Sequence, residues 1–453
     1  MFEHKKIFIL GFARSGYEAA KWLVEHDNEV LLNDSKKEEE VNQEQLQELK
    51  EKGVHFVFGS HPDEILDKSF DYLIKNPGVP IDHKYVLKAK ELDIPVINEV
   101  EMAYRLLPDD VTLIGITGTN GKTTTTTLTY EIIKKSGKHV HLTGNIGYPL
   151  CSFLPKLEYN DIIVMEVSCQ QLENLDQFKP HIAVMTNLSP AHIDFLKSYD
   201  NYKRVKGKIF QNQTSEDIAI LNIENQDVLD LTKSILATTK YFSSKHEING
   251  CYIKDQGIYY YADRVLDLDK IKVSGVHNYE NIMAAIMVAK ELQIDDDVIR
   301  QVVYEFKGVE HRLEYVMEYH GRTFYNDSKA TNNKSTQIAL SAFQQPTILI
   351  MGGLDRGQDF SELTDYMKHV KQIVCYGQNK EKVKEYADSI GIDVIVVDNL
   401  KEATGQAYQI SKEGDVILLS PATASWDQYA CFEDRGLEFK EIVKEISNED
   451  SNN

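Results

Sequence analysis

Cysteine is scarce in this chain of 453 residues, which contains only five. They are widely spaced, and no two form a Cys-x-x-Cys pair, so neither a disulfide framework nor a zinc site is indicated. The five are Cys151, Cys169, Cys251, Cys375 and Cys431. Long apolar runs are also missing, because the run after Lys6 is too short for a signal-peptide core and no later run reaches membrane-spanning length. We therefore expect a cytoplasmic protein that is neither exported nor inserted into a membrane.

Positive charge is in deficit. The chain has 50 Lys and Arg against 71 Asp and Glu, and its net charge of −21 argues against a surface that binds nucleic acid or anionic membranes. A local basic pocket around phosphates remains compatible with that balance. The 25 glycines and 11 prolines are not clustered as in a disordered chain. At roughly 150 residues per domain, the length predicts about three folded domains, whose partners are small ligands.

The stretch Val111–Thr124 runs from apolar β-branched residues through a glycine-rich turn into Lys-Thr. Small residues let backbone N–H groups surround phosphate oxygens, Lys122 neutralises charge, and Thr123 offers a magnesium ligand. Ile116 stands where an ordinary P-loop has its first glycine, so the pattern is only Gly-x-x-Gly-Lys-Thr. A turn without a ligand is the alternative, but the order strand, turn, Lys-Thr favours a nucleotide. The candidate residues are Gly118, Thr119, Asn120, Gly121, Lys122, Thr123 and Thr124.

The first residues predict a βαβ unit: a strand at 6–11, a helix at 16–25 and a strand at 29–34. The turn from Gly11 to Gly16 resembles a dinucleotide fingerprint, but Ala13 replaces the glycine that permits close approach of a pyrophosphate. The indication of NAD is therefore weak. A tight turn without a ligand is the alternative to a nucleotide-like ligand, whose candidate contacts are Arg14, Ser15 and Asp34.

Several later residues have open interpretations when each is taken alone. Glu166 ends an apolar strand, where a carboxylate beside the phosphate turn would suit magnesium, although many strand-terminal acids are merely solvated. Asn145 is either a turn residue or a substrate contact. His192 in a loop and Lys206 at the edge of a helical apolar face are more often structural or exposed. Asn278 could be only a helix cap.

Strands and helices alternate again in the last third, which indicates another doubly wound sheet. Three polar clusters follow strands there, at 325–332, 352–357 and 420–428. Ligands of open α/β sheets bind at the carboxyl ends of strands, so we expect a site rather than three capped loops. The predicted fold is α/β with three domains: a Rossmann-like domain at 1–102, a central P-loop ATPase-like parallel sheet with a small β subdomain at 103–307, and a Rossmann-like domain at 308–453.

Together these segments resemble the Mur ligase family, and they appear in family order along the whole chain. The matching segments are 118–123, 144–147, 166–168, 192–194, 202–206, 277–281 and 311–312. Residues 326–332 and 419–428 are similar to the family members that add D-glutamate to UDP-N-acetylmuramoyl-L-alanine. The Asp-Asn-Pro-Arg signature of the diamino-acid members is missing. The first domain is of the kind those D-glutamate-adding members use for UDP rather than NAD.

The resemblance implies an ATP-dependent ligase of peptidoglycan precursor synthesis, which forms an acyl phosphate that the incoming amine attacks. It implies catalytic roles for Lys122, His192 and Lys206. Thr123 and Glu166 would hold one Mg²⁺, and His192 with a carbamylated Lys206 a second. Nucleotide contacts would include Asn278, Asn281, Arg312 and Asp327. Asn145 and Ser168 would lie near the muramoyl-alanine end, and the D-glutamate pocket would comprise Lys329, Thr331, Arg356, Ser425 and Phe432. We expect a monomer.

Three departures from the family pattern affect substrate contacts. Arg356 stands where the family usually has lysine, Cys169-Gln170 where Ser-Phe is common, and Pro190-Ala191 where a more acidic pair is usual. Three other functions are weighed. Folylpolyglutamate synthase shares the phosphate turn but does not need the first βαβ domain. An NAD-dependent oxidoreductase would use the Gly11 turn, and a switch GTPase would need an Asn-Lys-x-Asp motif, which is missing.

Overall fold

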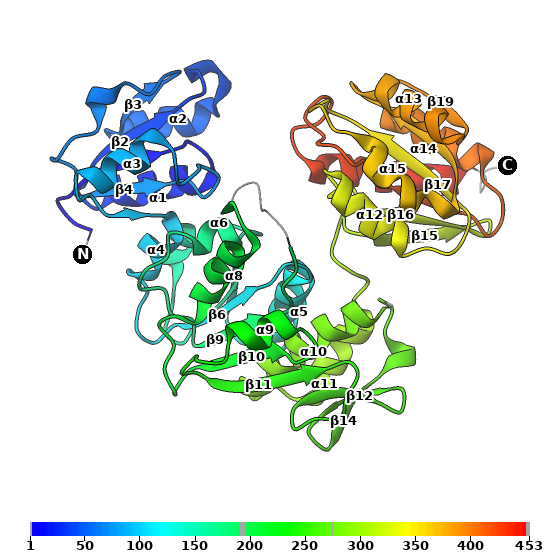
Figure 1. Cartoon of the computed structure of the whole chain (residues 1–453), viewed down its shortest axis with the longest axis horizontal. Helices are drawn as coiled ribbons and strands as arrows, with labels where there is room; N and C mark the ends of the chain where they lie inside the picture. The colour runs from blue at the N-terminus through cyan, green and yellow to red at the C-terminus, as the bar shows by residue number, and fades with distance from the viewer. Residues whose placement is uncertain (1, 191–195, 274, 450–453) are drawn as a thin grey trace. The chain divides into compact units, whose positions relative to one another are not determined.

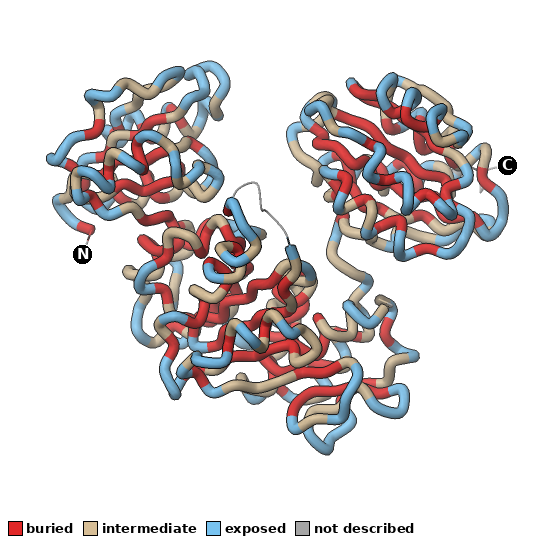
Figure 2. Tube along the Cα trace, in the orientation of Figure 1, coloured by how far each residue is buried: buried red, intermediate tan, exposed pale blue. Residues whose placement is uncertain are grey.

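The computed structural model describes residues 2–190, 196–273 and 275–449 (Figure 1). The chain divides into two compact units, Met1–Phe306 and Lys307–Asn453. Buried residues follow the strands of the sheets in both units, as the red segments of Figure 2 show. No helix within the described ranges combines the length and the apolar character that crossing a bilayer requires.

The first unit begins with a five-stranded parallel sheet in the order β3-β2-β1-β4-β5. Its strands are β1 (Lys6–Leu10), β2 (Glu29–Asp34), β3 (His55–Phe58), β4 (Tyr72–Lys75) and β5 (Val96–Ile97). Its helical elements are α1 (Arg14–Glu25), η1 (Glu38–Glu40), α2 (Gln43–Glu51), η2 (Asp63–Ile65), α3 (Lys84–Glu91) and α4 (Glu99–Tyr104). The predicted βαβ opening is present. Residues Ile7 to Leu10 are all buried, because a parallel sheet is covered on both faces.

A nine-stranded sheet follows in the same unit, in the order β14-β13-β12-β11-β10-β9-β6-β8-β7. Its strands are β6 (Thr112–Thr117), β7 (Val140–Gly144), β8 (Ile162–Glu166), β9 (Ile182–Met185), β10 (Ile218–Asn222), β11 (Thr238–Ser243), β12 (Cys251–Lys254), β13 (Gly257–Tyr260) and β14 (Asp263–Asp267). Its helical elements are α5 (Lys122–Lys135), η3 (Leu150–Lys156), α6 (Cys169–Leu172), α8 (Tyr199–Gly207), η4 (Lys208–Phe210), α9 (Gln226–Leu231), η5 (Leu268–Lys270), α10 (Val276–Glu291) and α11 (Asp296–Glu305).

The small β subdomain predicted for the central domain, at 217–274, is not separate: its strands β10 to β14 continue this sheet. β10 pairs in parallel with β9 and β11, and β11 pairs in parallel with β12. The pairings of β13 with β12 and with β14, at the edge, are antiparallel. The reason is burial: Ala219 to Asn222 of β10 are buried, and a strand covered on both faces belongs in a sheet interior.

Helix α5 starts with five consecutive threonines, which have poor helix propensity. Thr125, Thr126 and Thr129 are buried in the structure, and α5 packs against α10. Every residue of α10 from Asn281 to Ala289 is buried, so this is a core helix that supplies the tertiary contact α5 needs.

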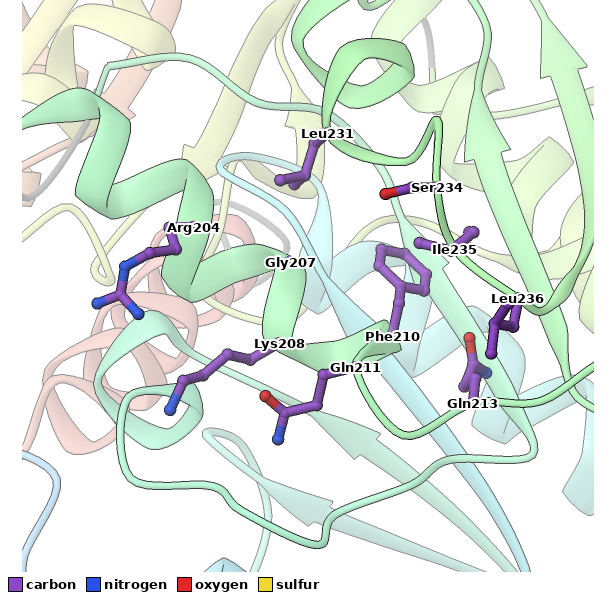
Figure 3. Close-up of a pocket in the computed structure, with 10 residues that line it drawn as sticks. All are labelled: Arg204, Gly207, Lys208, Phe210, Gln211, Gln213, Leu231, Ser234, Ile235 and Leu236. Atoms are coloured by element: carbon purple, nitrogen blue, oxygen red, sulfur yellow. The ribbon is translucent and has the colours of Figure 1, made fainter.

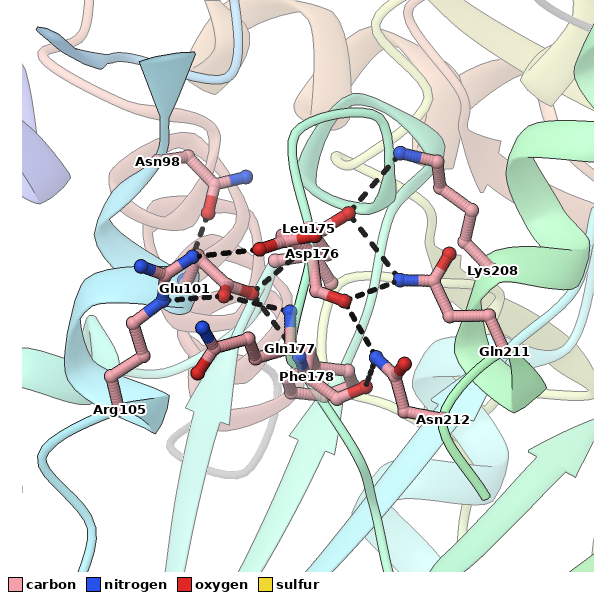
Figure 4. A network of polar contacts seen from close by, with 10 residues as sticks. All are labelled: Asn98, Glu101, Arg105, Leu175, Asp176, Gln177, Phe178, Lys208, Gln211 and Asn212. Carbon is pink, nitrogen blue, oxygen red and sulfur yellow. Dashed lines mark hydrogen bonds and ion pairs between the residues drawn. The ribbon is translucent and has the colours of Figure 1, made fainter. Parts of the chain in front are cut away.

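The buried carboxylate of Glu101 links α4 to the loop at 176–178, which leads into the central sheet (Figure 4). Glu101 accepts hydrogen bonds from the backbone N–H groups of Asp176, Gln177 and Phe178 at 2.8–3.2 Å and from Arg105 Nε at 2.7 Å. The carbonyl groups of the same loop accept from Lys208, Gln211 and Asn212, which follow α8. The loop therefore connects α4 with the end of the helix that carries Lys206.

The second unit contains a six-stranded sheet in the order β15-β16-β20-β17-β18-β19, parallel except for β15. Its strands are β15 (Glu314–Tyr319), β16 (Arg322–Asn326), β17 (Thr347–Gly352), β18 (Val370–Tyr376), β19 (Val394–Val396) and β20 (Val416–Leu419). Its helical elements are α12 (Asn333–Ser341), η6 (Phe360–His369), α13 (Lys380–Ile390), α14 (Leu400–Ile410) and α15 (Phe432–Glu449). The predicted doubly wound sheet is present.

Candidate functional site

The glycine-rich turn between β6 and α5 is closely packed. A Cβ atom on Gly118 would lie 2.0 Å from Thr186 Oγ1, and one on Gly121 would lie 2.1 Å from Asn281 Oδ1. Both glycines also have positive φ, 149° and 81°. No residue with a side chain fits at either position without a shift of its neighbours.

The backbone N–H groups in and after this turn fall into two sets, one that donates to Asn187 and one at the start of α5. The N–H groups of Thr119 and Asn120 donate to Asn187 O and Oδ1 at 2.8 and 2.9 Å. The first turn of α5, which begins at Lys122, has N–H groups without intrahelical acceptors. These groups and the positive end of the helix dipole make an anion site. Lys122 Nζ donates to Thr119 O at 2.8 Å, so its ammonium lies over the turn.

Glu166 ends β8, which pairs with β6 beside the glycine turn. Its side chain is only 1% exposed, and Oε1 accepts a hydrogen bond from Asn145 Nδ2 at 2.8 Å. Oε2 is buried and has no hydrogen-bond partner among the described residues. A buried carboxylate oxygen left in that state is costly unless a cation binds it, so Glu166 and the buried Thr123 fit the predicted Mg²⁺. Over the described ranges, no group of three or more His, Cys, Asp or Glu is placed to hold a metal.

Lys206 lies inside the protein rather than at the edge of its helix. Its side chain is 1% exposed, and Nζ donates to Thr117 Oγ1 at 2.8 Å. Burial and the nearby Lys122 hold the pKa of the Lys206 amine well below its usual range. Tyr202, one turn earlier on α8, is hydrogen-bonded through its hydroxyl to Thr119 Oγ1 at 2.8 Å. Helix α8 is thus attached at two points, to the end of β6 through Lys206 and to the glycine turn through Tyr202. His192 lies outside the described residues.

A pocket of about 300 Å³ lies in the first unit. It brings together four of the predicted substrate residues: Arg14 and Ser15 in the first turn of α1, Asn145 after β7 and Ser168 after β8. Its lining residues are Ala13, Arg14, Ser15, Asn76, Pro77, Glu99, Gly144, Asn145, Gly147, Pro149, Ser168 and Gln171. Asn76, Glu99 and Gln171 are not among the residues that the sequence motifs predict for the site. The rule that ligands bind beyond strand ends would have found Asn76, which directly follows β4.

Asp34, the remaining candidate of the first domain, does not line this pocket. Its Oδ2 accepts from Phe12 N at 2.6 Å and its Oδ1 from Lys36 N at 2.8 Å. Both carboxylate oxygens therefore hold backbone turns. Glu99, in contrast, lies in the pocket, is 3% exposed and accepts from Cys151 N at 2.7 Å. Burial raises the pKa of Glu99 to about 7.

The predicted nucleotide residues fall in both units. In the first, Asn281 is buried against Gly121 and accepts from Thr125 Oγ1 at 3.4 Å, while Asn278 is half-buried in the first turn of α10. In the second, Asp327 accepts from Ser420 Oγ at 2.8 Å and from Leu313 N at 3.1 Å, close to Arg312 in sequence. Burial raises the pKa of Asp327 to about 7.

The three polar clusters of the last third follow β16, β17 and β20, which are neighbours in the sheet. They therefore meet at one edge, as expected. Lys329 Nζ lies 5.5 Å from the ring centroid of Phe432, and the Arg356 guanidinium lies 4.4 Å from that of Trp426. The Ser425 hydroxyl is buried and has no hydrogen-bond partner within the described part of the chain. Thr331 N donates to Lys329 O at 2.9 Å.

Another pocket, of about 600 Å³, contains none of the predicted site residues (Figure 3). It is lined by Arg204, Gly207, Lys208, Phe210, Gln211, Gln213, Leu231, Ser234, Ile235 and Leu236. Its cationic side chains are already engaged, since Arg204 donates to Asn201 Oδ1 and Lys208 to the carbonyl groups of Glu173 and Leu175.

Family models match three stretches of the chain. They are the Mur ligase MurD-like N-terminal domain at residues 5–98, the Mur ligase middle domain at 116–289 and the Mur ligase glutamate ligase domain at 311–423. Two relatives are named UDP-N-acetylmuramoylalanine--D-glutamate ligase. The one from Bacillus cereus strain AH820 is 44% identical over 447 residues, and the one from Geobacillus kaustophilus is 43% identical over 449. Each alignment covers 98% of both chains.

Solved structures share the fold at low sequence identity. The UDP-N-acetylmuramate-alanine ligase MurC from Thermotoga maritima superposes with a TM-score of 0.61 at 19% identity, over 98% of this chain and 100% of that one. The MurF ligase from Thermotoga maritima, solved in complex with ADP, has a TM-score of 0.55 at 18% identity, over 97% and 98%.

Proposed function

The chain belongs to the Mur ligase family, and from that premise we propose that it joins D-glutamate to UDP-N-acetylmuramoyl-L-alanine, with ATP converted to ADP and phosphate. One observation carries this proposal. Asn145 lines the pocket that contains Arg14, Ser15 and Ser168, and it also donates to Glu166 beside the glycine turn. A substrate in that pocket would place its reacting end next to the phosphates.

The reaction has two steps, and the first is an electrostatic problem. The substrate carboxylate attacks the γ-phosphorus of ATP, which releases ADP and leaves an acyl phosphate. Both reactants are anions, so they meet only where positive charge is fixed in place. Lys122 and the N–H groups at the start of α5 supply that charge. In the second step the neutral amine of D-glutamate attacks the acyl carbon, phosphate leaves with its electron pair, and the nitrogen loses one proton to solvent as the amide forms.

Mg²⁺, when bound, would neutralise phosphate oxygens and hold them in line. Thr123 and the unpartnered Oε2 of Glu166 are suited to one ion. Lys206 as a carbamate, with His192, is proposed for a second. The unprotonated Lys206 nitrogen would form a bond to the carbon of CO₂ and lose one proton to solvent, giving an anionic oxygen donor. The low pKa of this amine favours the form that reacts.

Selection of D-glutamate is assigned to the second unit. Lys329, Arg356 and the unpartnered hydroxyl of Ser425 offer donors for the two carboxylates, with Thr331 and Phe432 beside them. A guanidinium presents two parallel N–H groups to a carboxylate, so Arg356 would bind it in a bidentate manner where a lysine would act as a point charge. Asn278, Asn281, Arg312 and Asp327 are proposed for the nucleotide.

The decisive experiment measures ADP release by the full chain with ATP, Mg²⁺, UDP-N-acetylmuramoyl-L-alanine and a panel of amino acids. We expect release only when both the nucleotide substrate and D-glutamate are present. Equal release with L-alanine or a diamino acid, or NADH binding without ATP binding, would contradict the proposal. We also expect a cytoplasmic monomer, and light scattering after gel filtration would detect a larger assembly.

A further inference from the structure

Lys75, the last residue of β4, has a fully buried side chain with 0% exposure. Its ammonium donates to Val79 O at 2.7 Å and, at 3.5 Å, to the carbonyl oxygens of Asn76 and Pro77. The three acceptors belong to one short turn. A buried cation is costly unless it is well hydrogen-bonded, and the preceding strand residues Leu73 and Ile74 are apolar. The presence of a cation at this position therefore needs a reason.

The turn that Lys75 holds is part of the wall of the proposed substrate pocket. Asn76 and Pro77 line that pocket, and Asn76 Nδ2 donates to Ser15 Oγ at 3.0 Å. The turn after β1 also packs closely against Asn76, because a Cβ atom on Gly11 would lie 2.9 Å from Asn76 Cβ. A chain of contacts thus leads from the buried ammonium through Asn76 to Ser15 in the first turn of α1.

The positive charge of Lys75 is stabilised by the dipoles of backbone carbonyl groups rather than by a hydrogen-bonded carboxylate. Its hydrogen-bond acceptors are carbonyl groups. Among the described residues, the acidic group that acts on its charge is Glu173, which directly follows α6. Glu173 Oε2 is itself buried without a hydrogen-bond partner among those residues. Burial lowers the pKa of Lys75 to about 8, so most of the amine is protonated near pH 7. Lys75 does not line the pocket itself, but its neighbours Asn76 and Pro77 do, so its positive charge lies behind the pocket wall.

We propose that Lys75 is a positioning residue for the nucleotide substrate. It fixes the 76–79 turn so that Asn76 holds Ser15 and the start of α1 in their binding geometry, and its charge favours a diphosphate in the pocket. The inference rests on the proposed function, because it takes the ligand of this pocket to be a nucleoside diphosphate sugar.

The test uses the full chain and measures binding of UDP-N-acetylmuramoyl-L-alanine by titration calorimetry, together with KM for all three substrates. Lys75→Met keeps the length of the side chain and removes its charge. We expect Kd and KM for the nucleotide substrate to rise about tenfold, since misplaced binding groups act on this scale. The KM values for ATP and D-glutamate should stay within about twofold, and so should all constants of Lys68→Met, an exposed lysine in the turn that precedes β4.

Asn76→Ala gives a second test that leaves the buried cation in place. It removes the link to Ser15, so we expect a similar rise in Kd, and the double variant with Lys75→Met should be no worse than the weaker-binding single variant. This variant decides the matter if Lys75→Met does not fold. Wild-type Kd in both variants, or an equal rise in all three KM values, would overturn the inference alone. If the unaltered chain does not bind the nucleotide substrate at all, the proposed function fails as well.

Discussion

Lys206 Nζ and Thr117 Oγ1 are hydrogen-bonded at 2.8 Å in the interior of the first unit. Thr117 ends the strand that leads into the glycine turn, and its hydroxyl donates onward to Val167 O at 2.7 Å. The lysine amine is therefore fixed beside the proposed phosphate site and shielded from water. Burial at this position, together with the nearby Lys122, lowers the pKa of the Lys206 amine, as carbamate formation needs.

Replacement of Lys206 by alanine should abolish nearly all ligase activity, and acetate should restore part of it. The reason is that Mg²⁺ prefers anionic oxygen donors, which a carbamate supplies and an ammonium does not. Activity should be assayed with and without bicarbonate. Lys208→Ala is the matched control: it should keep kcat but lower the melting temperature, because Lys208 donates to the carbonyl groups of Glu173 and Leu175. Full activity of Lys206→Ala in bicarbonate-free buffer would refute the carbamate.

Lys122→Ala should lower kcat for ADP release about a hundredfold or more, the scale of a lost transition-state donor. Its ammonium lies over the glycine turn, so its removal leaves triphosphate charge uncompensated. Lys134→Ala, in the last turn of the same helix, should retain near-normal turnover. Near-normal turnover of Lys122→Ala itself would show that the phosphates bind elsewhere.

Arg356→Ala should raise KM for D-glutamate about tenfold and leave ATP affinity nearly unchanged, since a hydrogen bond to a charged group is worth about 1.5–3 kcal/mol. Trp426→Ala should have a smaller effect in the same direction, because its ring lies 4.4 Å from the guanidinium and holds it by a cation–π contact. Steady-state kinetics with each substrate varied in turn separates the two constants. Equal losses of affinity for ATP and for D-glutamate would show that this loop does not serve D-glutamate binding alone.

Glu99 should make stability depend on pH. Its pKa is about 7 in the folded protein against an ordinary value of 4.5, so between these values the folded state binds more protons than the unfolded state. The unfolding free energy therefore falls as pH rises through this window, by on the order of 3 kcal/mol for this group. Melting temperatures at pH 5 and pH 8 measure the effect. Glu99→Gln should shrink the difference, and the exposed Glu64→Gln should not; an unchanged difference in both variants would argue against a raised pKa.

The local elements and their order can be predicted from neighbouring residues. The apolar run of β6, the glycine turn and Lys122 predict strand, anion site and helix from neighbouring residues alone, and the alternation of strands and helices predicts doubly wound sheets. The edge at which three polar clusters meet in the second unit also follows, because parallel strands end on the same side.

Which side chains are buried and paired depends instead on contacts between segments that lie far apart in the chain. Lys206 looked like a residue at the edge of a helix, but it donates to a threonine 89 positions earlier in the chain, and its burial depends on strands that no local pattern specifies. Asp34 matched a fingerprint, yet backbone N–H groups use both of its oxygens. Lys75 lies at the end of an ordinary strand, and the role proposed for it depends on the contact between Asn76 and Ser15, 61 positions apart in the chain. Desolvation and hydrogen bonding over long sequence separations set these properties, and they act only once the chain is folded.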